Sequence, residues 1–487
     1  MTAEELFSRT SLKDYPFRGD SGKQEIELIT CDSRKVTPNS IFVCVKGSLG
    51  DGHDYAEEAL AKGAAWIVAQ RDCGVSRQIL AEDTRKIYSE LCGAFFGNPA
   101  QKLRLTAVTG TNGKTTSTWL LHHALQKLGV KAGLVGTVYN HTGREMVQAN
   151  YTTPDAWQLH QLLARMKAEG CTHVVLEASS QAIDQQRLYG CTFDCGIFTN
   201  LSPEHLDYHP DLESYYQAKK QLFSSCKKAA VNVGNPFGKR LAEELLEQGM
   251  EVFSFSAEGR ARLAAAEIEL FSDHCQGRIF FDGKEKTASL SLPGKFSMEN
   301  FLTALSALLM LGFPFEESVE AVSSCPSVPG RTEVCLCEDG ITVIRDYAHT
   351  PDSLEKMLSA MKEFCSGRLI TVFGCPGRRD RTKRPLMAKA VCRYADFAVM
   401  TADNPREESL DQIFSDAMMG LDGSENIRII ADRKEAIRWA LTESRPKDTV
   451  ILAGKGHENY QVLKDKTIFF DEKQLVNEIY LSCKEKK

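Results

Sequence analysis

Residues 103–129 read LRLTAVTGTNGKTTSTWLLHHALQKLG, an apolar strand, a glycine turn and a helix in immediate succession. This order places backbone N–H groups and a helix N-terminus around an anion, which is how nucleotide phosphates are bound. The usual phosphate-loop pattern is G-x-x-x-x-G-K-[S/T], but Val108 stands where its first glycine belongs. Lys114 can reach the terminal phosphates, and the Thr115 hydroxyl can ligate Mg²⁺. We therefore predict a nucleotide site; the alternative is a plain glycine turn with a solvated lysine.

The same alternation of strands and helices organises the rest of the chain. Buried strands are expected at HVVLEA, DCGIFTN and KAAVNV, and beyond residue 332 at ITVIRDYA, LITVFGC, DFAVMTAD, IRIIAD and TVILAGKG. Helical patterns between them predict parallel sheets covered by helices on both faces. The predicted fold class is α/β with three domains: a small N-terminal α/β domain (1–100), a central P-loop ATPase domain with a parallel sheet (101–330) and a C-terminal Rossmann-like, doubly wound domain (331–487). Residues 256–290 read as polar and less regular, and SVPGRTE at 327–333 reads as a linker.

Composition limits the classes of partner. Of 487 residues, 43% are hydrophobic and 25% charged, and the net charge of −6 favours neither nucleic acid nor an anionic membrane as a partner. No stretch approaches the roughly 18 apolar residues of a membrane helix, and the N-terminus lacks the apolar core of a signal peptide. The 16 cysteines are scattered through apolar segments, which is typical of buried thiols in a reducing compartment. The expected location is the cytoplasm.

Further segments accompany the glycine turn along the whole chain. They read CDSRKVTPNSIFVCVKG, NYTTPD, LEASSQAIDQQR, FTNLSPEHLDYH, YYQAKKQLF, DYAHTPDSL, VFGCPGRRDRTKRPLM, DNPRE and GKGHENYQ. Together with VTGTNGKTT, they closely resemble the Mur ligase family. The resemblance implies an ATP-dependent acid–amino-acid ligase with Mg²⁺ as cofactor, whose three domains bind the UDP-sugar, ATP and the amino acid in that order. The implied partners are UDP-MurNAc-L-Ala-D-Glu, meso-diaminopimelate and ATP, and the expected state is a monomer.

In such a ligase the γ-phosphate of ATP activates a carboxylate as an acyl phosphate, which the incoming amine attacks. Both steps build charge on oxygen, so the site needs cations and positioned donors more than a strong nucleophile. By resemblance, the catalytic residues are Lys114, Glu177, His205 and Lys219. Glu177 and His205 follow strands of the central sheet and would hold Mg²⁺ with Thr115. Lys219 would be carbamylated by CO₂, giving an anion that helps place a second Mg²⁺; by composition alone it is a surface lysine.

Other positions match the family's contacts to ATP and to the precursor. The ATP-binding set is Gly110, Thr111, Asn112, Gly113, Lys114, Thr115 and Thr116 in the loop, with Asn300, Arg331 and Asp346 further along the chain. The set for the UDP-MurNAc-dipeptide is Ser33, Thr152, Thr153, Ser179, Gln185 and Arg187. Because Arg331 and Asp346 come from the linker and the third domain, domain closure would couple to substrate binding and keep water from the acyl phosphate.

The amino acid to be added is expected to contact three motifs of the C-terminal domain. By resemblance, the ligases of this family that add the third amino acid use either meso-diaminopimelate or L-lysine, and diaminopimelate carries an extra carboxylate on its distal carbon. Arginine suits bidentate carboxylate recognition, so two arginines would meet two carboxylates and an acid would meet an amine. The resemblance assigns these contacts to Arg379, Asp403, Asn404, Pro405, Arg406, Gly454 and Glu458.

The sequence departs from the family pattern near these contacts. Pro376 and Arg378 replace the common Gly and Asp, which leaves the aim of Arg379 open. The segment REESL after DNP replaces a REDP-like ending and is expected only to change how the next helix starts.

Other functions are less consistent with the motifs. An L-lysine-adding ligase is expected to lack Arg406. A folylpolyglutamate synthetase or a D-Ala-D-Ala-adding ligase of the same superfamily would not explain DNPR together with GKGHE. A P-loop ATPase that switches a partner would turn over ATP without any precursor and would give the arginines of the third domain no role.

Overall fold

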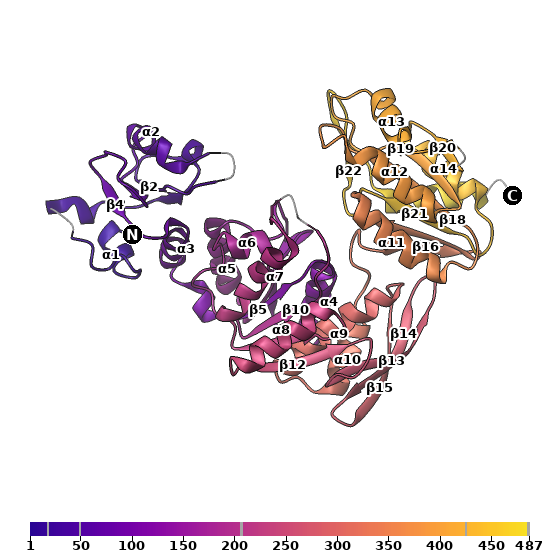
Figure 1. Cartoon of the computed structure of the whole chain (residues 1–487), viewed down its shortest axis with the longest axis horizontal. Helices are drawn as coiled ribbons and strands as arrows, with labels where there is room; N and C mark the ends of the chain where they lie inside the picture. Colours follow the sequence, from indigo (N-terminus) through magenta and orange to yellow (C-terminus); the bar gives the residue numbers. More distant parts are fainter. Residues whose placement is uncertain (17–18, 48–49, 205–207, 424–425, 485–487) are drawn as a thin grey trace. The chain divides into compact units, whose positions relative to one another are not determined.

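The computed structural model describes residues 1–16, 19–47, 50–204, 208–423 and 426–484 (Figure 1). The chain divides into two compact units. The first contains Met1–Arg262 with Thr303–Ser318, and the second contains Leu263–Leu302 with Val319–Lys487. Both units consist of sheets covered by helices, so the predicted α/β class is confirmed.

The first unit begins with a small parallel sheet. Its strands follow the chain in the order β1 (Leu28–Thr30), β2 (Ser40–Val43), β3 (Trp66–Ala69) and β4 (Gln78–Leu80). One core joins the strands to α1 (Ala3–Phe7) and α3 (Thr84–Phe95), and a second core includes α2 (Ala56–Ala61). The helix α3 also packs on α5 (Ala156–Ala168), where Phe95 and Trp157 have ring centroids 5.1 Å apart. The small sheet is therefore fixed to the larger one within this unit.

A predominantly parallel sheet forms the main body of the first unit. Its order is β8 (Met146–Gln148), β7 (Tyr139–His141), β6 (Ala132–Val135), β9 (His173–Glu177), β5 (Arg104–Thr109), β10 (Cys195–Phe198), β11 (Lys228–Asn232) and β12 (Glu251–Ser256). One core joins it to α5, α6 (Ser180–Asp184), α7 (Leu212–Lys220) and α8 (Pro236–Glu247), and α4 (Lys114–Lys127) packs on β5, β6 and β9. The glycine turn, Glu177 and the Thr199 region all follow carboxyl ends of adjacent central strands, where ligands bind in open α/β sheets.

The second unit starts with a feature that the sequence expectation missed. Residues 256–290 were expected to be irregular, but they include β13 (Leu263–Leu270), β14 (Cys275–Phe281) and β15 (Lys284–Leu290), which pair antiparallel. Asp282 and Gly283 both have positive φ, of 45° and 80°, as a two-residue hairpin turn requires. Alternating burial along β14 covers one face only, so the strand remains polar on the other face. The helices α9 (Lys295–Met310) and α10 (Phe315–Ser323) follow in the chain, and their residues 303–318 belong to the first unit.

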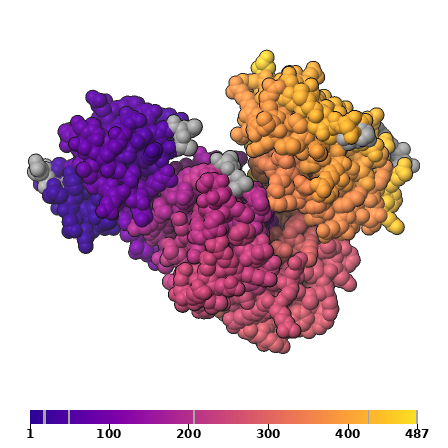
Figure 2. Space-filling view, in the orientation of Figure 1, coloured from indigo at the N-terminus to yellow at the C-terminus, as the bar shows by residue number. Residues whose placement is uncertain are grey.

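The larger sheet of the second unit is doubly wound. Its order is β16 (Glu333–Glu338), β17 (Ile341–Asp346), β21 (Thr449–Ala453), β18 (Leu369–Cys375), β19 (Phe397–Ala402) and β20 (Ile427–Ile429), and only β16 is antiparallel. One core contains α11 (Pro351–Phe364), α12 (Lys383–Tyr394) and α13 (Leu410–Met418), and another contains α14 (Arg433–Glu443) and α15 (Glu472–Lys484). A hairpin of β22 (Tyr460–Val462) and β23 (Thr467–Phe469) lies between β21 and α15 in the chain. The segment from residue 331 onward, orange to yellow in Figure 2, forms a continuous body.

All 16 cysteines are free thiols. Burial raises the pKa of several of these thiols, among them Cys191 and Cys195, to about 12. The buried cysteines therefore pack as small apolar side chains within the cores.

Candidate active site

The glycine turn begins at Gly110, because the residue before it still belongs to the sheet. Val108 is fully buried in β5, and its carbonyl accepts a hydrogen bond from the Ala178 N–H at 2.9 Å. Gly110 has a φ of 147°, and a Cβ there would lie 1.9 Å from Thr199 Oγ1. Glycine is therefore required at position 110, while position 108 requires a strand residue. This explains the valine in the phosphate-loop pattern.

The turn is anchored to the loop that follows β10. The Asn112 N–H donates to Asn200 Oδ1 at 3.0 Å, and Thr199 Oγ1 donates to the Asn112 carbonyl at 2.7 Å. Gly113, with a φ of 84°, precedes α4 and provides no side chain to cap it. The first N–H groups of an α-helix have no partner within the helix itself, so the N-terminus of α4 is a suitable position for an anion.

Two lysines converge on one carbonyl of this turn. Lys114 Nζ donates to the carbonyls of Gly110 and Thr111 at 2.9 and 2.8 Å, and Lys219 Nζ donates to the Gly110 carbonyl at 2.7 Å. Lys219 extends from α7, is 1% exposed, and its nitrogen lies 4.3 Å from the centroid of the Tyr215 ring. Burial, and secondarily the nearby Lys114 cation, lower the pKa of Lys219 well below its ordinary value, while Glu204 acts in the opposite direction. Lys219 is thus buried beside the phosphate loop, which composition alone did not indicate.

The Glu177 carboxylate lies at the centre of a group of threonine hydroxyls. Its Oε2 accepts from Thr115 Oγ1 and from Thr137 Oγ1, both at 2.9 Å, and its Oε1 accepts from the Thr137 N–H at 2.7 Å. Thr137 Oγ1 also lies 3.1 Å from Thr152 Oγ1. A Cβ on Gly136 would lie 2.5 Å from Glu177 Oε1, so the chain approaches the carboxylate closely there. Thr137 was not predicted, although it follows β6 at the same edge of the sheet.

These oxygens fit a Mg²⁺ site. Glu177 is 1% exposed, and within the described ranges its carboxylate pairs with hydroxyl and amide donors but with no lysine or arginine. No cluster of three or more His, Cys, Asp or Glu side chains suited to a metal occurs in the part of the chain that the structure describes. Mg²⁺ typically uses one or two carboxylates, waters and substrate phosphates, so one buried carboxylate beside a phosphate loop suffices. The predicted ligand His205 lies outside the described residues.

Four of the predicted precursor contacts form a second group beside Glu177. Thr153 Oγ1 donates to the Glu177 carbonyl at 2.6 Å and lies 3.3 Å from Ser179 Oγ. Arg187 donates from Nη1 to the Thr153 carbonyl at 2.9 Å and from Nη2 to Gln185 Oε1 at 2.7 Å. A guanidinium, an amide and two hydroxyls are thus collected at one place, together with Thr152.

The predicted contact Ser33 lies apart from this group, in the small sheet. It begins a 3-10 turn, Ser33–Lys35, and the preceding residue Asp32 caps this turn by accepting a hydrogen bond from the Arg34 N–H at 3.1 Å. The Ser33 carbonyl accepts a hydrogen bond from Lys62 Nζ at 3.0 Å.

The second unit contains the remaining ATP residues. Asp346, at the end of β17, accepts from the Thr332 N–H at 2.7 Å and from the Ala348 N–H at 2.8 Å. It therefore fixes the chain directly after Arg331, whose guanidinium lies 5.2 Å from the centroid of the Tyr347 ring. Asn300, on α9, is 6% exposed.

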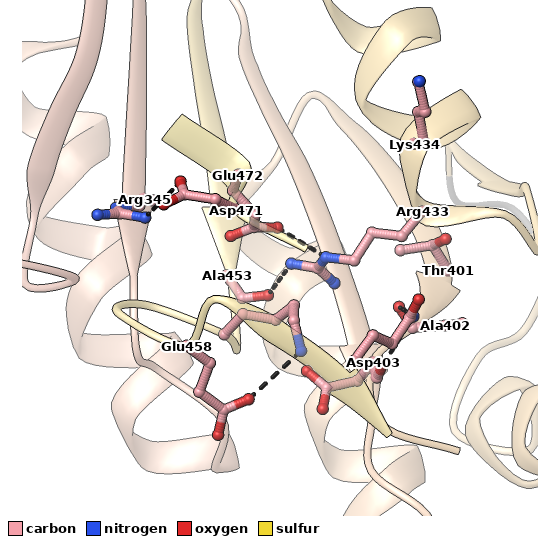
Figure 3. A network of polar contacts seen from close by, with 12 residues as sticks. Arg345, Thr401, Ala402, Asp403, Arg433, Lys434, Ala453, Glu458, Asp471 and Glu472 are labelled. Carbon is pink, nitrogen blue, oxygen red and sulfur yellow. Dashed lines mark hydrogen bonds and ion pairs between the residues drawn. The ribbon is translucent and has the colours of Figure 1, made fainter. Parts of the chain in front are cut away.

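Two of the predicted amino-acid motifs meet directly in the second unit. Figure 3 labels Asp403 of one motif and Glu458 of the other. Asn404 Nδ2 donates to Glu458 Oε2 at 2.9 Å, which joins the DNPR segment (403–406) to the GKGHE segment (454–458). Lys455, which was not predicted, is fully buried and donates to Asn404 Oδ1 at 3.2 Å and to Glu458 Oε2 at 3.3 Å. Gly454 has a φ of 112°, and a Cβ there would lie 2.8 Å from Asp403 Oδ2. The buried Lys455 ammonium group thus already binds one carboxylate oxygen of Glu458.

Arg406 and Arg379 lie on neighbouring loops. Arg406 has a φ of 55°, and its N–H donates to the Val462 carbonyl at 3.1 Å, whereas Arg379 is exposed. Tyr347 lies within the electrostatic influence of both sides of the site: burial and Glu458 raise the pKa of its hydroxyl, and Arg331 and Arg379 oppose that rise. Cations and carboxylates from both sides of the site therefore act on one tyrosine hydroxyl.

The expectation for REESL was incomplete. Glu408 does more than start the next helix, because its Oε1 accepts from the Arg378 N–H at 2.7 Å while α13 begins only at Leu410. This contact also fixes the residue before Arg379, whose position the sequence left open.

A fully buried ion pair supports the end of β21, from which one of these loops departs (Figure 3). Arg433 Nε donates to Glu472 Oε1 at 2.7 Å, and its Nη2 donates to the Ala453 carbonyl at 2.9 Å. Both side chains are 0% exposed. Ala453 immediately precedes Gly454, so the pair holds the strand end from which the GKGHE segment departs.

Comparison with known proteins gives matches along most of the chain. Family models described as "Mur ligase family, catalytic domain", "Mur ligase middle domain" and "Mur ligase, glutamate ligase domain" match residues 25–92, 108–308 and 330–456. A UDP-N-acetylmuramoyl-L-alanyl-D-glutamate–2,6-diaminopimelate ligase of Clostridium acetobutylicum is 39% identical over 462 residues, 93% of this chain and 94% of the relative. A ligase with the same substrate name from Clostridium perfringens is 39% identical over 473 residues, 96% of this chain and 97% of the relative.

Solved structures agree with these matches. One 2,6-diaminopimelate ligase of this kind is 31% identical, has a TM-score of 0.72 and covers 99% of both chains. A D-alanyl-D-alanyl ligase from Acinetobacter baumannii, at 18% identity and a TM-score of 0.62 over 94% of this chain and 95% of its own, shares the fold. Within the described residues, no helix combines the length and apolar character needed to cross a membrane.

Proposed function

This chain belongs to the Mur ligase family and is an ATP-dependent amide ligase, and on that premise we propose that it adds meso-diaminopimelate to UDP-MurNAc-L-Ala-D-Glu. The new amide would form on the side-chain carboxylate of the D-glutamate, in the synthesis of peptidoglycan precursors. We propose that the reaction takes place in the cytoplasm, where ATP and a nucleotide-linked substrate are expected.

The phosphate loop and the group around Glu177 support the activation step. The D-glutamate carboxylate attacks the γ-phosphorus of ATP, ADP leaves, and an acyl phosphate forms. Lys114 and the N-terminus of α4 would stabilise the negative charge of the transferring group. Mg²⁺, held by Glu177 and Thr115, would supply Lewis-acid neutralisation of the phosphates. The Thr153–Arg187 group lies beside this carboxylate, where the dipeptide end of the precursor would need to be held.

Lys219 has the environment that a carbamate requires. Its amine is buried, and the lowered pKa favours the neutral form, whose lone pair can bond to the carbon of CO₂ with release of one proton. The product is an anion near the Lys114 cation. We propose that this carbamate forms and that it offers oxygen ligands to a second Mg²⁺.

The hydrogen bond between Asn404 and Glu458 is the observation that carries the amino-acid assignment. It brings an acid, which suits an ammonium group, next to the segment that bears Arg406. L-Lysine lacks the second carboxylate and would leave one arginine without a partner. The relatives named as 2,6-diaminopimelate ligases support the same choice. Because Lys455 already binds Glu458 Oε2, we propose that the ammonium group binds Oε1.

Phosphate release by the purified full-length chain tests the proposal. With Mg-ATP and UDP-MurNAc-L-Ala-D-Glu present, release should depend on meso-diaminopimelate and should be much slower with L-lysine. Equal rates with the two amino acids would refute the selectivity. Turnover that requires neither the precursor nor an amino acid would instead support a partner-switching ATPase and overturn the ligase assignment.

A further inference from the structure

Glu408 lies where two predicted substrate loops of the second unit meet. We call residues 376–380 the first loop and residues 403–408 the second loop; they contain Arg379 and Arg406 respectively. The Glu408 carboxylate accepts from the Arg378 N–H of the first loop at 2.7 Å, through Oε1. Its Oε2 accepts from Arg384 Nη2 of α12 at 2.5 Å. One carboxylate of the second loop therefore fixes the backbone of the first loop.

The two loops also touch through their backbones. The Gly377 N–H donates to the Asn404 carbonyl at 3.0 Å, and a Cβ on Gly377 would lie 2.0 Å from the Pro405 carbonyl oxygen. Arg378 and Arg406 have left-handed φ values of 52° and 55°. Such conformations are unfavourable for residues with side chains and persist when surrounding contacts impose them. The Glu408–Arg378 hydrogen bond and the Arg406–Val462 hydrogen bond are contacts of that kind.

A buried guanidinium orients the Glu408 carboxylate. Arg384 is 1% exposed, and its Nη1 donates to Asp416 Oδ2 at 2.8 Å while its Nη2 donates to Glu408 Oε2. The Asp416 carboxylate in turn accepts hydrogen bonds from Nε and Nη2 of Arg381, at 2.8 and 2.9 Å. The Arg384 guanidinium and then the Arg378 N–H lower the pKa of Glu408, so the carboxylate is charged at neutral pH. The helix α12 thus holds Glu408 in one orientation.

We propose that Glu408, oriented by Arg384, is a positioning residue that sets the spacing between Arg379 and Arg406 and thereby selects an amino acid with two carboxylates. Glu408 does not itself contact the amino acid. The inference rests on the proposed function, because it takes the two arginines as partners of the two carboxylates of diaminopimelate. A ligand with one carboxylate needs only one of the arginines and is insensitive to their spacing.

The test compares Glu408→Gln with Glu407→Gln in full-length protein. Both variants remove one negative charge from adjacent positions, but Glu407 is an exposed partner of the Arg378 side chain and does not contact Arg384. In Glu408→Gln a charge-assisted contact is lost, so the KM for meso-diaminopimelate should rise about tenfold or more, while the KM for ATP stays unchanged. The ratio of kcat/KM for diaminopimelate over L-lysine should fall by a similar factor. Glu407→Gln should retain the wild-type KM for meso-diaminopimelate and the wild-type ratio of kcat/KM values.

Glu408→Asp provides a second variant that keeps the charge but shortens the side chain, and it should lose the same selectivity. Equal losses for diaminopimelate, L-lysine and ATP would mean a general structural defect and would overturn the positioning role. An unchanged diaminopimelate KM in Glu408→Gln would overturn it as well. If the wild-type chain shows no amino-acid-dependent phosphate release, the proposed function itself fails, and that result is distinguishable before any variant is made.

Discussion

Replacing Arg433 by Met should strongly destabilise the second unit. Arg433 and Glu472 are both 0% exposed, and the variant leaves the Glu472 carboxylate buried without a cation. Breaking a buried ion pair from one side costs about 3–5 kcal/mol of unfolding free energy. In a unit of about 200 residues, that loss lowers the melting temperature by about 6–20 °C.

A double variant separates the ion pair from simple loss of packing. Arg433 Nη1 and Glu472 Oε2 have no hydrogen-bond partner among the described residues, so the native pair is incompletely satisfied. Replacing both members by apolar side chains of similar size is therefore expected to be close to neutral. Arg433→Met with Glu472→Leu should recover most of the stability that Arg433→Met loses.

Arg438→Met is the matched control on the same helix. Arg438 is 39% exposed and pairs with Glu435 at 3.4 Å, and such surface pairs contribute about 0–1 kcal/mol. Urea denaturation with hydrogen–deuterium exchange in peptides covering α14 and α15 reports on the second unit specifically. The reasoning is wrong if Arg433→Met behaves like Arg438→Met, or if the double variant is no more stable than the single one.

Three further predictions concern the two candidate sites. Arg406→Ala should raise the KM for meso-diaminopimelate at least about tenfold and leave the KM for ATP unchanged, because it would remove the proposed bidentate contact to a substrate carboxylate. Initial rates measure both constants, and an unchanged amino-acid KM contradicts the proposed role. Thr137→Val removes the hydroxyl that donates to Glu177 Oε2, so phosphate release should need a higher Mg²⁺ concentration and kcat/KM should fall about tenfold, whereas an unchanged Mg²⁺ titration would exclude that function. Burial, Arg331 and Arg345 lower the pKa of His457 from 6.5 to about 4. Between pH 6.5 and 4 the unfolded chain binds more protons than the folded one, so the second unit should lose up to about 3 kcal/mol of unfolding free energy as the pH falls. In urea titrations, His457→Asn should flatten this pH dependence. An equally steep pH dependence in the variant would rule out His457 as its source.

The sequence predicted the fold well where apolar strands alternate with helices. It predicted a sheet with the glycine turn and Glu177 at one edge, and the structure places them there. It failed at residues 256–290, because polar residues on the outward face of β14 and β15 obscured the alternation. The pair Asp282–Gly283 was the signal that could have revealed the hairpin.

The site was predictable only in part, for a physical reason. Motifs show which residue types are available, but contacts between segments far apart in the chain depend on tertiary packing. Lys455 belongs to GKGHE, yet only the fold brings it to Asn404, 51 positions away. Glu408 looked like part of a helix start because its partner, Arg378, lies in a different loop. Thr137 belongs to no recognised motif. Its place directly after β6 was the only signal that could have predicted it as a site residue.

The strand position of Val108 has a consequence for nucleotide binding. Its backbone is paired with β9 in register with Glu177, so the approach to the turn is already ordered in the folded chain. The anchoring bonds from Asn200 and Thr199 restrict the turn itself. A loop in this state has little conformational entropy left to lose when phosphate arrives. Affinity should therefore depend mainly on electrostatics and hydrogen bonds at the helix N-terminus rather than on a disorder-to-order transition of the loop.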